Sequence, residues 1–361
     1  SNTQGLNEIV ISASKFGQQK RDIPQKIVNI NSNQVLFSNP QTSADLLETT
    51  GSVYIQKSQL GGGSPMIRGF STNRLLITVD GVRMNNAIFR GGNLQNVISI
   101  DPFSIHKTEV ILGAGSVIYG SDAIGGVMSF YTQKPKLSYK DSTNFNINTI
   151  VRYASASDEK TGHLDFNVGM KKWALLTSLS YSNFDDLRMG SHGPEDYLRP
   201  EFVNTEGNED AIIQNENPLI QKQTGYNQLN IMQKVRYEPF DNLNFDLGIF
   251  YSTTSDIPRY DRLIIQDNGD MKFAEWYYGP QDWFQTNFQV TKFSSSSNLY
   301  DKINATIAYQ NFKESRVNRK FQSIYRNKRE EEVNTYSLNF DFEKKLTEKT
   351  KFFYGVEYVY N

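Results

Sequence analysis

The chain contains 361 residues with 38 Lys and Arg against 39 Asp and Glu, no cysteine, and 13% aromatic residues. This length allows one large or two ordinary domains. The net charge of −1 excludes a strongly basic nucleic-acid binder, and the lack of cysteine excludes a disulfide framework, a thiolate metal site and a cysteine nucleophile. The mean hydropathy of −0.55 is typical of a soluble protein, but a transmembrane β-barrel gives the same value because its apolar residues alternate with polar ones.

The N-terminal region, residues 1–25, is polar apart from the segment Glu8–Ser12 (EIVIS) and is predicted to form a flexible arm. It lacks the basic start and apolar run of a signal peptide, so for an exported protein we expect that signal to have been removed. No segment approaches the ~18 consecutive apolar residues of a transmembrane helix.

Residues 26–137 are glycine-rich and favour short elements, so we predict an α+β domain here. Pro135 and the surrounding TQKPK sequence mark its end. The expected elements are a helix at Ala44–Thr50 capped by Ser43 and ended by Gly51, strands at Val53–Gln56, Leu75–Val79 and Glu109–Leu112, and a hairpin turn at Asp80–Gly81.

Residues 138–361 show a different pattern, with apolar and polar residues alternating in runs of about ten. Each run suits a tilted strand that crosses a bilayer, which takes ~9–11 residues. We predict nine such strands, centred on residues 145–153, 164–170, 173–181, 229–237, 243–251, 284–290, 303–309, 336–342 and 352–360.

The connections between these strands alternate between short and long, with a modest first loop. Short turns at one rim and long loops at the other are typical of an antiparallel outer-membrane barrel, and aromatic residues near the strand ends fit its interfacial girdles. A soluble antiparallel sandwich is the alternative. It fits less well because sandwich loops have no one-sided length bias and the polar faces here are uniformly hydrophilic.

The strand count is odd, and the last strand, residues 351–361, would have an unpaired edge. Such an edge is costly in lipid. We therefore expect this strand to pair with something beyond the nine strands, either the rest of a longer barrel or a barrel-assembly machine.

No enzymatic motif is complete. Gly113 to Gly115 and Gly115 to Gly120 approach dinucleotide-loop and P-loop spacing but lack the residues that each requires. The three histidines lie far apart, and an acidic loop around Asp185 is more typical of a solvated surface than of a cation site. We predict no enzyme and no resident metal, although a Ser/His/Asp arrangement stays open.

Several motifs resemble the plug of TonB-dependent outer-membrane receptors. They are EIVISASK (residues 8–15), MIRGF (66–70), LLITVDGVRMN (75–85) and DPFSIHKTEVILGAGSVIYGSDAIGGVMSF (101–130). The resemblance implies a barrel of about 22 strands when complete, about nine of them present here, with the α+β plug in its lumen. It also implies a TonB-box role for Glu8, Ile9, Val10, Ile11 and Ser12, whose apolar run could add as a strand to a partner's sheet edge.

Five residues form the plug motif: Arg68, Gly69, Phe70, Asp80 and Gly81. Arg68 is expected either to pair with carboxylates of the barrel wall or to be a solvated loop arginine. The segment GGGSPMIRGF with the following RMNNAIFRGGNLQNVISIDP is similar to haem and haemoglobin receptors of the family. Its candidate substrate-facing residues are Phe89, Arg90, Asn93 and Gln95. Asn93 stands where those receptors can carry a haem-ligating histidine, which argues against direct ligation from the plug.

The resemblance predicts TonB-energised uptake of an iron-containing ligand, haem or haemoprotein first and a ferric siderophore second, with no tightly bound cofactor. A non-transporting outer-membrane binding protein and a soluble β-rich enzyme are the other hypotheses. The expected location is the outer membrane of a Gram-negative cell. The expected partners are the TonB complex through the N-terminal arm, outer-membrane lipid, the barrel-assembly machinery during biogenesis and an accessory surface lipoprotein, with no nucleic acid.

Overall fold

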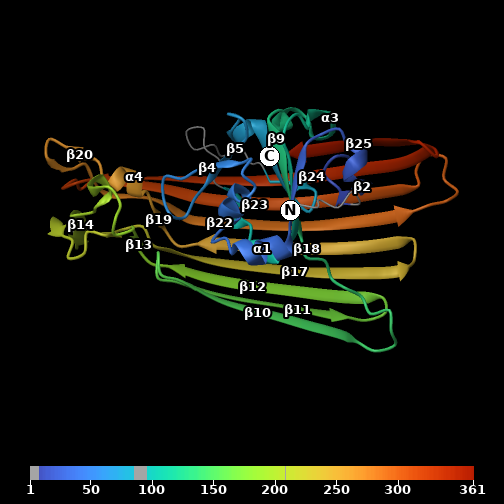
Figure 1. Cartoon of the computed structure of the whole chain (residues 1–361), viewed down its shortest axis with the longest axis horizontal. Coiled ribbons are helices and arrows are strands. Elements are labelled where there is room, and N and C mark those ends of the chain that lie inside the picture. The colour runs from blue at the N-terminus through green and yellow to red at the C-terminus, as the bar shows by residue number, and fades with distance from the viewer. Residues whose placement is uncertain (1–7, 85–95, 208) are drawn as a thin grey trace.

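The computed structural model describes residues 8–84, 96–207 and 209–361. The protein is mainly β, as predicted, and has two parts: a long antiparallel sheet, here called the wall, and a smaller α+β domain, the plug, which lies against one face of it (Figure 1). Among the described residues, no helix is long and apolar enough to cross a membrane.

The wall is a meander in which each strand pairs with the next, in the order β10-β11-β12-β17-β18-β22-β23-β24-β25, and the short β19 (Ile257–Pro258) adds to β22. The nine predicted strands are confirmed. They are β10 (Asn144–Ala154), β11 (Glu159–Gly169), β12 (Trp173–Phe184), β17 (Tyr226–Phe240), β18 (Leu243–Thr254), β22 (Phe273–Phe293), β23 (Lys302–Lys320), β24 (Arg326–Thr347) and β25 (Thr350–Tyr360).

The wall does not close on itself within the described residues, because β10 and β25 stand at opposite ends of the strand order. Strand β25 is ordered and pairs with β24, from Tyr336↔Tyr360 to Thr347↔Thr350. A self-contained nine-strand barrel is therefore not what this chain forms, and a further partner for residues 351–361 stays a prediction.

Two rims bound the wall. At the short-turn rim, the turns at 170–172, 241–242, 294–301 and 348–349 join neighbouring strands; the opposite, long-loop rim carries the long connections (right and left in Figure 1). The long-loop rim holds β13 (Leu187–Arg188), β14 (Glu201–Glu206), β15 (Glu209–Gln214), β16 (Ile220–Gln221), α4 (Tyr260–Leu263), β20 (Gln266–Asp267), β21 (Asp270–Met271) and a 3-10 turn at Glu195–Tyr197.

Two expected loops are partly wrong. Strand β22 begins at Phe273, inside the predicted link 254–282, and the β23–β24 hairpin runs through most of the predicted link 313–332. These strands have 19 to 22 residues rather than about ten. The outer parts of β23 and β24 are polar on both faces, so the alternation disappears there although the ladder continues, supported by pairs such as Arg316–Glu331 at 2.7 Å. In β22, aromatic residues at the successive positions 276 to 278 and two register shifts against β23 interrupt the alternation instead.

The plug is built on a five-stranded sheet in the order β3-β8-β9-β6-β7, in which only β6 and β9 are parallel. Its strands are β3 (Ile27–Asn31), β8 (Ile105–Ile111), β9 (Gly126–Thr132), β6 (Leu75–Val79) and β7 (Val82–Arg83), with the small pair β4 (Tyr54–Gln56) and β5 (Ser64–Met66) beside them. The helices are α1 (Ser32–Ser38), α2 (Ser43–Glu48) and α3 (Ser116–Tyr119), with 3-10 turns at Lys20–Asp22, Thr72–Arg74, Asn96–Ser99, Pro102–Ser104 and Ser121–Ala123.

The predicted helix near residue 44 is present, but its cap is one residue earlier than expected. Thr42 is the N-cap, and its side chain and that of Asp45 form a reciprocal capping box. Ser43 instead donates a hydrogen bond to the carbonyl of Ile100. Helix α1 was not predicted, although Asn31 and Gln34 form a capping box at its start.

The predicted arm is folded over its described residues. Strand β1 (Ile9–Val10) pairs with β2 (Gln18–Gln19), and Val10 is fully buried against the plug. The polar side chains that suggested flexibility have partners: Lys20 pairs with Glu8, and Lys15 pairs with Asp341 of the wall.

Candidate functional site

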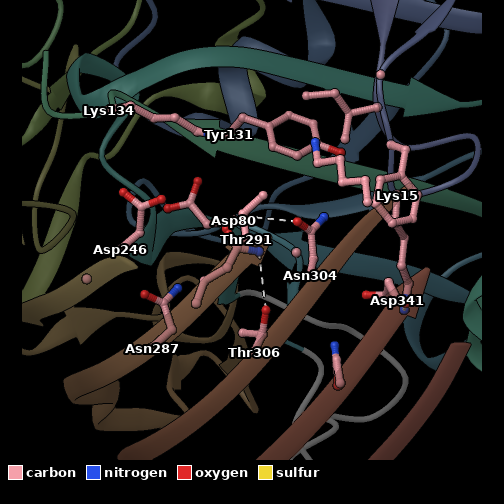
Figure 2. A pocket seen from close by; sticks show the side chains of 18 of the residues that line it. Lys15, Asp80, Tyr131, Lys134, Asp246, Asn287, Thr291, Asn304, Thr306 and Asp341 are labelled. Atoms are coloured by element: carbon pink, nitrogen blue, oxygen red, sulfur yellow. Dashed lines mark hydrogen bonds and ion pairs between the residues drawn. The ribbon is translucent and has the colours of Figure 1, made fainter. Parts of the chain in front are cut away.

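A cavity of about 300 Å³ lies where the N-terminal segment, the plug and the wall meet (Figure 2). Its wall side is close to the short-turn rim, since Thr291 and Lys302 flank the turn at 294–301. Its lining combines two of the predicted sets, the TonB-box-like segment (Ile9 and Ile11) and the plug turn (Asp80 and Gly81).

The predicted hairpin turn is confirmed between β6 and β7, where Val79 pairs with Val82. Asp80 and Gly81 have φ values of 51° and 84°, the pair of left-handed residues that a tight hairpin requires and that glycine adopts without strain. This turn holds the Asp80 carboxylate at the cavity.

Asp80 joins the plug to the wall. Its carboxylate accepts hydrogen bonds from the backbone N–H and hydroxyl of Thr132, at 2.9 and 2.8 Å, and from Lys234 of β17 at 2.7 Å. Burial opposes ionisation, but the charge of Lys234 and these hydrogen bonds hold the pKa of Asp80 below its usual value. The sequence indicated this residue as a turn former only, and its ion pair depends on the docking of plug and wall.

A second polar link joins the N-terminal segment to the last two wall strands. Lys15 Nζ lies 3.0 Å from Asp341 and 3.4 Å from Glu357. Arg83 of the plug binds the other oxygen of Glu357 at 2.9 Å and also pairs with Asp122. Lys15 of the N-terminal arm, the plug and strands β24 and β25 therefore share one charged network.

The segment Glu8–Ser12 is also held by the plug itself. The N–H groups of Ile11 and Ser12 donate to the carboxylate of Glu109, at 3.0 and 2.7 Å to Oε2. Lys107 donates to the carbonyl of Ile9, and Tyr119 donates to that of Ser12 at 2.8 Å. None of these three plug residues carries a sequence signal for this role, because they lie about 100 residues from the segment.

The cavity contains more positive than negative side chains. Lys134 forms no ion pair with any residue that the structure describes, and its pKa is lowered by burial and by neighbouring cations including Arg236. Lys302 lies 5.5 Å from the ring centre of Phe16. The pocket can therefore contact an anionic group.

The MIRGF motif lies elsewhere. Arg68 is exposed at a hairpin-like bend in which Ile67 and Phe70 exchange backbone hydrogen bonds, and it forms no ion pair with the described wall. The pairing of Arg68 with carboxylates of the barrel wall stays a prediction. Phe70 packs so closely on Gly125 that a Cβ there would lie 2.4 Å from the Phe70 Cβ.

The candidate substrate-facing residues Phe89, Arg90, Asn93 and Gln95 lie outside the described residues. In the acidic loop, Asp186 accepts hydrogen bonds from the backbone of Thr224 and Gly225. No group of three or more His, Asp or Glu residues suited to a metal ion occurs among the described residues.

The structure does bring a serine, a histidine and aspartates together at the plug–wall interface. His163 Nδ1 lies 2.7 Å from the Ser180 hydroxyl and Nε2 lies 3.1 Å from Asp165. Ser180 donates to Asp101 of the plug at 2.6 Å, and burial raises the pKa of Asp101. Ser180 is only 1% exposed, so its hydroxyl faces the plug and meets no solvent-borne substrate. The cluster positions the plug on the wall.

Comparisons with known proteins agree with this architecture. Residues 19–127 match the family described as the TonB-dependent Receptor Plug Domain. Over 144 residues the chain is 34% identical to the vitamin B12 transporter BtuB of Vibrio vulnificus (strain YJ016), covering 39% of this chain and 23% of that protein. Over 189 residues it is 29% identical to lactoferrin-binding protein A of Neisseria meningitidis serogroup B (strain ATCC BAA-335 / MC58), covering 48% and 20% of the two proteins.

The fold is shared with solved structures. The FrpB iron transporter from Neisseria meningitidis (F3-3 variant) superimposes with a TM-score of 0.71 at 16% identity, covering 92% of this chain and 48% of that one. The chain thus spans less than half the length of these relatives. At this identity the structural likeness shows the fold alone.

Proposed function

We propose, from the premise that this chain belongs to the TonB-dependent receptors, that it is part of a receptor for energised uptake of a metal-bearing or vitamin-like ligand. The family's members are outer-membrane proteins with a plug inside a β-barrel, and this chain carries the plug and part of that barrel. The proposed reaction is transport, in which no covalent bond of the ligand changes.

The observation that carries the proposal is the place of the segment Glu8–Ser12. It lies near the short-turn rim of the wall, which in outer-membrane barrels faces the periplasm. It contacts the plug through backbone hydrogen bonds, so a pull on this segment acts directly on the plug. Its Ile-Val-Ile run favours an extended conformation that can add to the edge of a partner sheet.

Displacement of the plug would break polar contacts together with part of an apolar cluster that the plug and the wall share. The links to the wall include Asp80–Lys234, Lys15–Asp341 and the contact of Ser180 with Asp101. Water can replace such contacts as they open, because polar groups regain hydrogen bonds in solution. We therefore propose that the pull of a TonB complex opens a path between plug and wall.

We further propose that the ligand contains iron. Haem is our first candidate because of the resemblance in residues 61–102, and a ferric siderophore is the alternative. The printed names of the relatives cover vitamin B12, lactoferrin and iron, so they favour no single ligand. Barrel-assembly machinery during biogenesis and a surface lipoprotein complete the proposed set of partners.

Energy coupling is tested by replacing Val10 with proline in the full-length receptor. Proline removes the backbone N–H and blocks strand addition, so we expect ligand binding to survive and uptake to be lost. Val10→Ile is the matched control, since it keeps the N–H and the apolar character. Unchanged uptake by the proline variant would overturn the coupling role of Glu8–Ser12.

The ligand is tested by adding haem to the purified full-length receptor and recording the Soret band. Asn93→His is expected to strengthen haem binding and shift the band, because a histidine nitrogen ligates haem iron and an asparagine does so poorly. Growth on a ferric siderophore, without any haem binding, would transfer the proposal to the siderophore.

A further inference from the structure

The cavity of about 300 Å³ between the plug and the wall is lined by two lysines that come from different parts of the molecule. Lys134 follows strand β9 of the plug, and Lys302 is the first residue of strand β23 of the wall. Neither lysine forms an ion pair with a residue that the structure describes. The two ammonium groups are close enough to repel each other, so an anion between them removes this repulsion.

The carboxylates around the cavity are already paired with other cations. These pairs are Asp80–Lys234 at 2.7 Å, Asp246–Arg236 at 2.8 Å, Asp341–Lys15 at 3.0 Å and Glu343–Lys351 at 3.3 Å. Glu343 is the residue of β24 that lies opposite Lys302 in the sheet. Because these carboxylates are engaged, the charges of Lys134 and Lys302 are available to the acidic group of a ligand.

The wall side of the cavity supplies neutral hydrogen-bonding groups. Figure 2 shows Asn287, Asn304 and Thr306 on this side and Lys134 on the plug side. Asn339, which lies opposite Thr306 in the sheet, also lines the cavity; it is only 4% exposed, and its side-chain oxygen is buried without a hydrogen-bond partner. A buried acceptor of this kind is costly until it receives a hydrogen bond, which a hydroxyl group donates and a carboxylate does not.

Gly248 of β18 makes room for a ligand at the centre of the wall side. Its neighbours across the sheet are Lys234 of β17 and Asn287 of β22. A Cβ at position 248 would lie 2.5 Å from Oδ1 of Asn287, so any larger residue would push this amide aside. The cavity volume of about 300 Å³ is at the small end of the range for ligand pockets. The space therefore fits a small organic acid.

The position of the cavity indicates the source of such an acid. Lys302 directly follows the turn at 294–301, so the cavity is near the short-turn rim of the wall. In outer-membrane barrels this rim faces the periplasm. A small acid dissolved in the periplasm therefore reaches this end of the molecule without crossing the barrel.

We propose that the cavity is a further binding site, for a small hydroxy acid from the periplasm. Lys134 and Lys302 bind its acidic groups, and Asn339 accepts a hydrogen bond from its hydroxyl group. The bound acid bridges the plug and the wall because the two lysines belong to different parts. It therefore favours the docked plug, as does any ligand that binds only the docked state. This site is separate from the proposed uptake ligand, and no covalent bond changes in it.

The site is tested with the purified full-length receptor and two probes, malate and succinate, which differ by one hydroxyl group. Isothermal titration calorimetry measures the affinity for each. We expect malate to bind about tenfold more tightly than succinate, since only malate satisfies Asn339. Asn339→Leu should lower the affinity for malate to that for succinate and leave succinate binding unchanged. Lys134→Met and Lys302→Met should each weaken malate binding by about tenfold or more.

Lys349→Met is the matched control, because Lys349 is exposed in another turn of the short-turn rim and does not line the cavity. Its affinity for malate should equal that of the parent. Saturating malate should slow proteolysis of the plug in the parent and in this control, but not in Lys134→Met.

The site would be overturned if the parent did not bind malate, or if folded Lys134→Met and Lys302→Met bound it as tightly as the parent. Equal affinities of the parent for malate and succinate would overturn the proposal of a hydroxy acid. If Lys134→Met does not fold, as judged by protease resistance without ligand, Lys302→Met decides in the same way.

Discussion

The plug buries mainly apolar side chains, whereas the wall buries mainly polar ones. All five residues of β6 in the plug, Leu75–Val79, are buried, in the manner of a water-soluble domain. In the wall, Ile147 and Val151 are 57% and 85% exposed, whereas His163 and Ser180 are 2% and 1% exposed. The outer face is apolar and exposed, and the inner face meets the plug. The surface between plug and wall is mixed, because Phe250 and Trp283 of the wall belong to the same buried apolar cluster as Val79 and Ile100 of the plug.

This difference bears on how a packed plug can be displaced. Its contacts with the wall include ion pairs and hydrogen bonds, among them Asp80–Lys234 and Ser180–Asp101, and such contacts exchange with water at small net cost. The apolar cluster that the plug shares with wall residues such as Phe250 is the part of the interface whose exposure to water costs more. Substitutions in the plug core, on the outer face of the wall and at the plug–wall interface test this difference in turn, from the largest expected effect to the smallest.

The largest effect is expected from a charge in the plug core. Ile77→Asp places a carboxyl group at a fully buried position of β6, and we expect a loss of ~4 kcal/mol or more in the free energy of unfolding of the plug. Denaturant unfolding of the full-length receptor measures it, with Ile77→Val, expected to cost ~1 kcal/mol, as control. A loss below that of the control would contradict an apolar plug core.

A charge on the outer face of the wall should lower the free energy of unfolding by a smaller amount. Ile231 is on the exposed face of β17, opposite Leu179, and Ile231→Lys is expected to destabilise the barrel by ~2–4 kcal/mol in lipid, depending on depth. Unfolding in lipid vesicles measures this, and Ile231→Val should be nearly neutral. If Ile231→Lys changes the free energy of unfolding as little as Ile231→Val does, this face does not contact lipid.

The Asp80–Lys234 pair should contribute less than either core. Asp80→Asn leaves Lys234 without its partner, and we expect ~1–3 kcal/mol of weaker plug docking at pH 7. Because the folded-state pKa of Asp80 lies below its usual 3.8, the contribution is fully present above that pH and is lost as the pH falls through the lowered value. Protease susceptibility of the plug, followed against pH, should show the two proteins converging only in acid.

The smallest effect is expected for the charged network around Lys15, which is partly exposed to solvent. Lys15→Met removes the pairs with Asp341 and Glu357, whose side chains keep 15–20% exposure, and should weaken docking of the segment by ~0.5–1 kcal/mol. The change is measured as the rate at which a soluble thiol reagent labels a cysteine introduced by Ser12→Cys in the full-length receptor. Added salt should reduce the difference in rate between the Lys15→Met variant and its parent. Lys20→Met, which breaks only the local pair with Glu8, should have a smaller effect.

The sequence predicted the wall better than the plug. The two-residue period reports directly which face of a strand meets lipid, so the nine strands were found, and the Asp80–Gly81 turn was found because its dipeptide requires positive φ. The period is lost in β23 and β24 where both faces are polar, and in β22 where successive aromatic residues and register shifts interrupt it, so these three strands are longer than predicted. Helix α1 was missed because its capping signals lie within a short, mixed segment.

The candidate site likewise has one part that the sequence predicted and another part that it did not. The segment Glu8–Ser12 and the turn at Asp80 could be located from local sequence, since strand propensity and turn chemistry are properties of neighbouring residues. Their partners Glu109, Lys107, Tyr119 and Lys234 are 98 to 154 residues away along the chain. No local pattern marks a carboxylate that binds a distant backbone.

The sequence by itself therefore determined the kind of protein: a lipid-facing antiparallel wall, a glycine-turned plug and a strand-forming N-terminal segment, each specified by a short-range pattern. Tertiary structure alone decided that the segment is docked, that Asp80 pairs with Lys234 and that Glu109 covers a strand edge. The physical reason is that periodicity and turns are fixed by adjacent residues, whereas an ion pair or a buried hydrogen bond exists only after the plug and the wall have packed together.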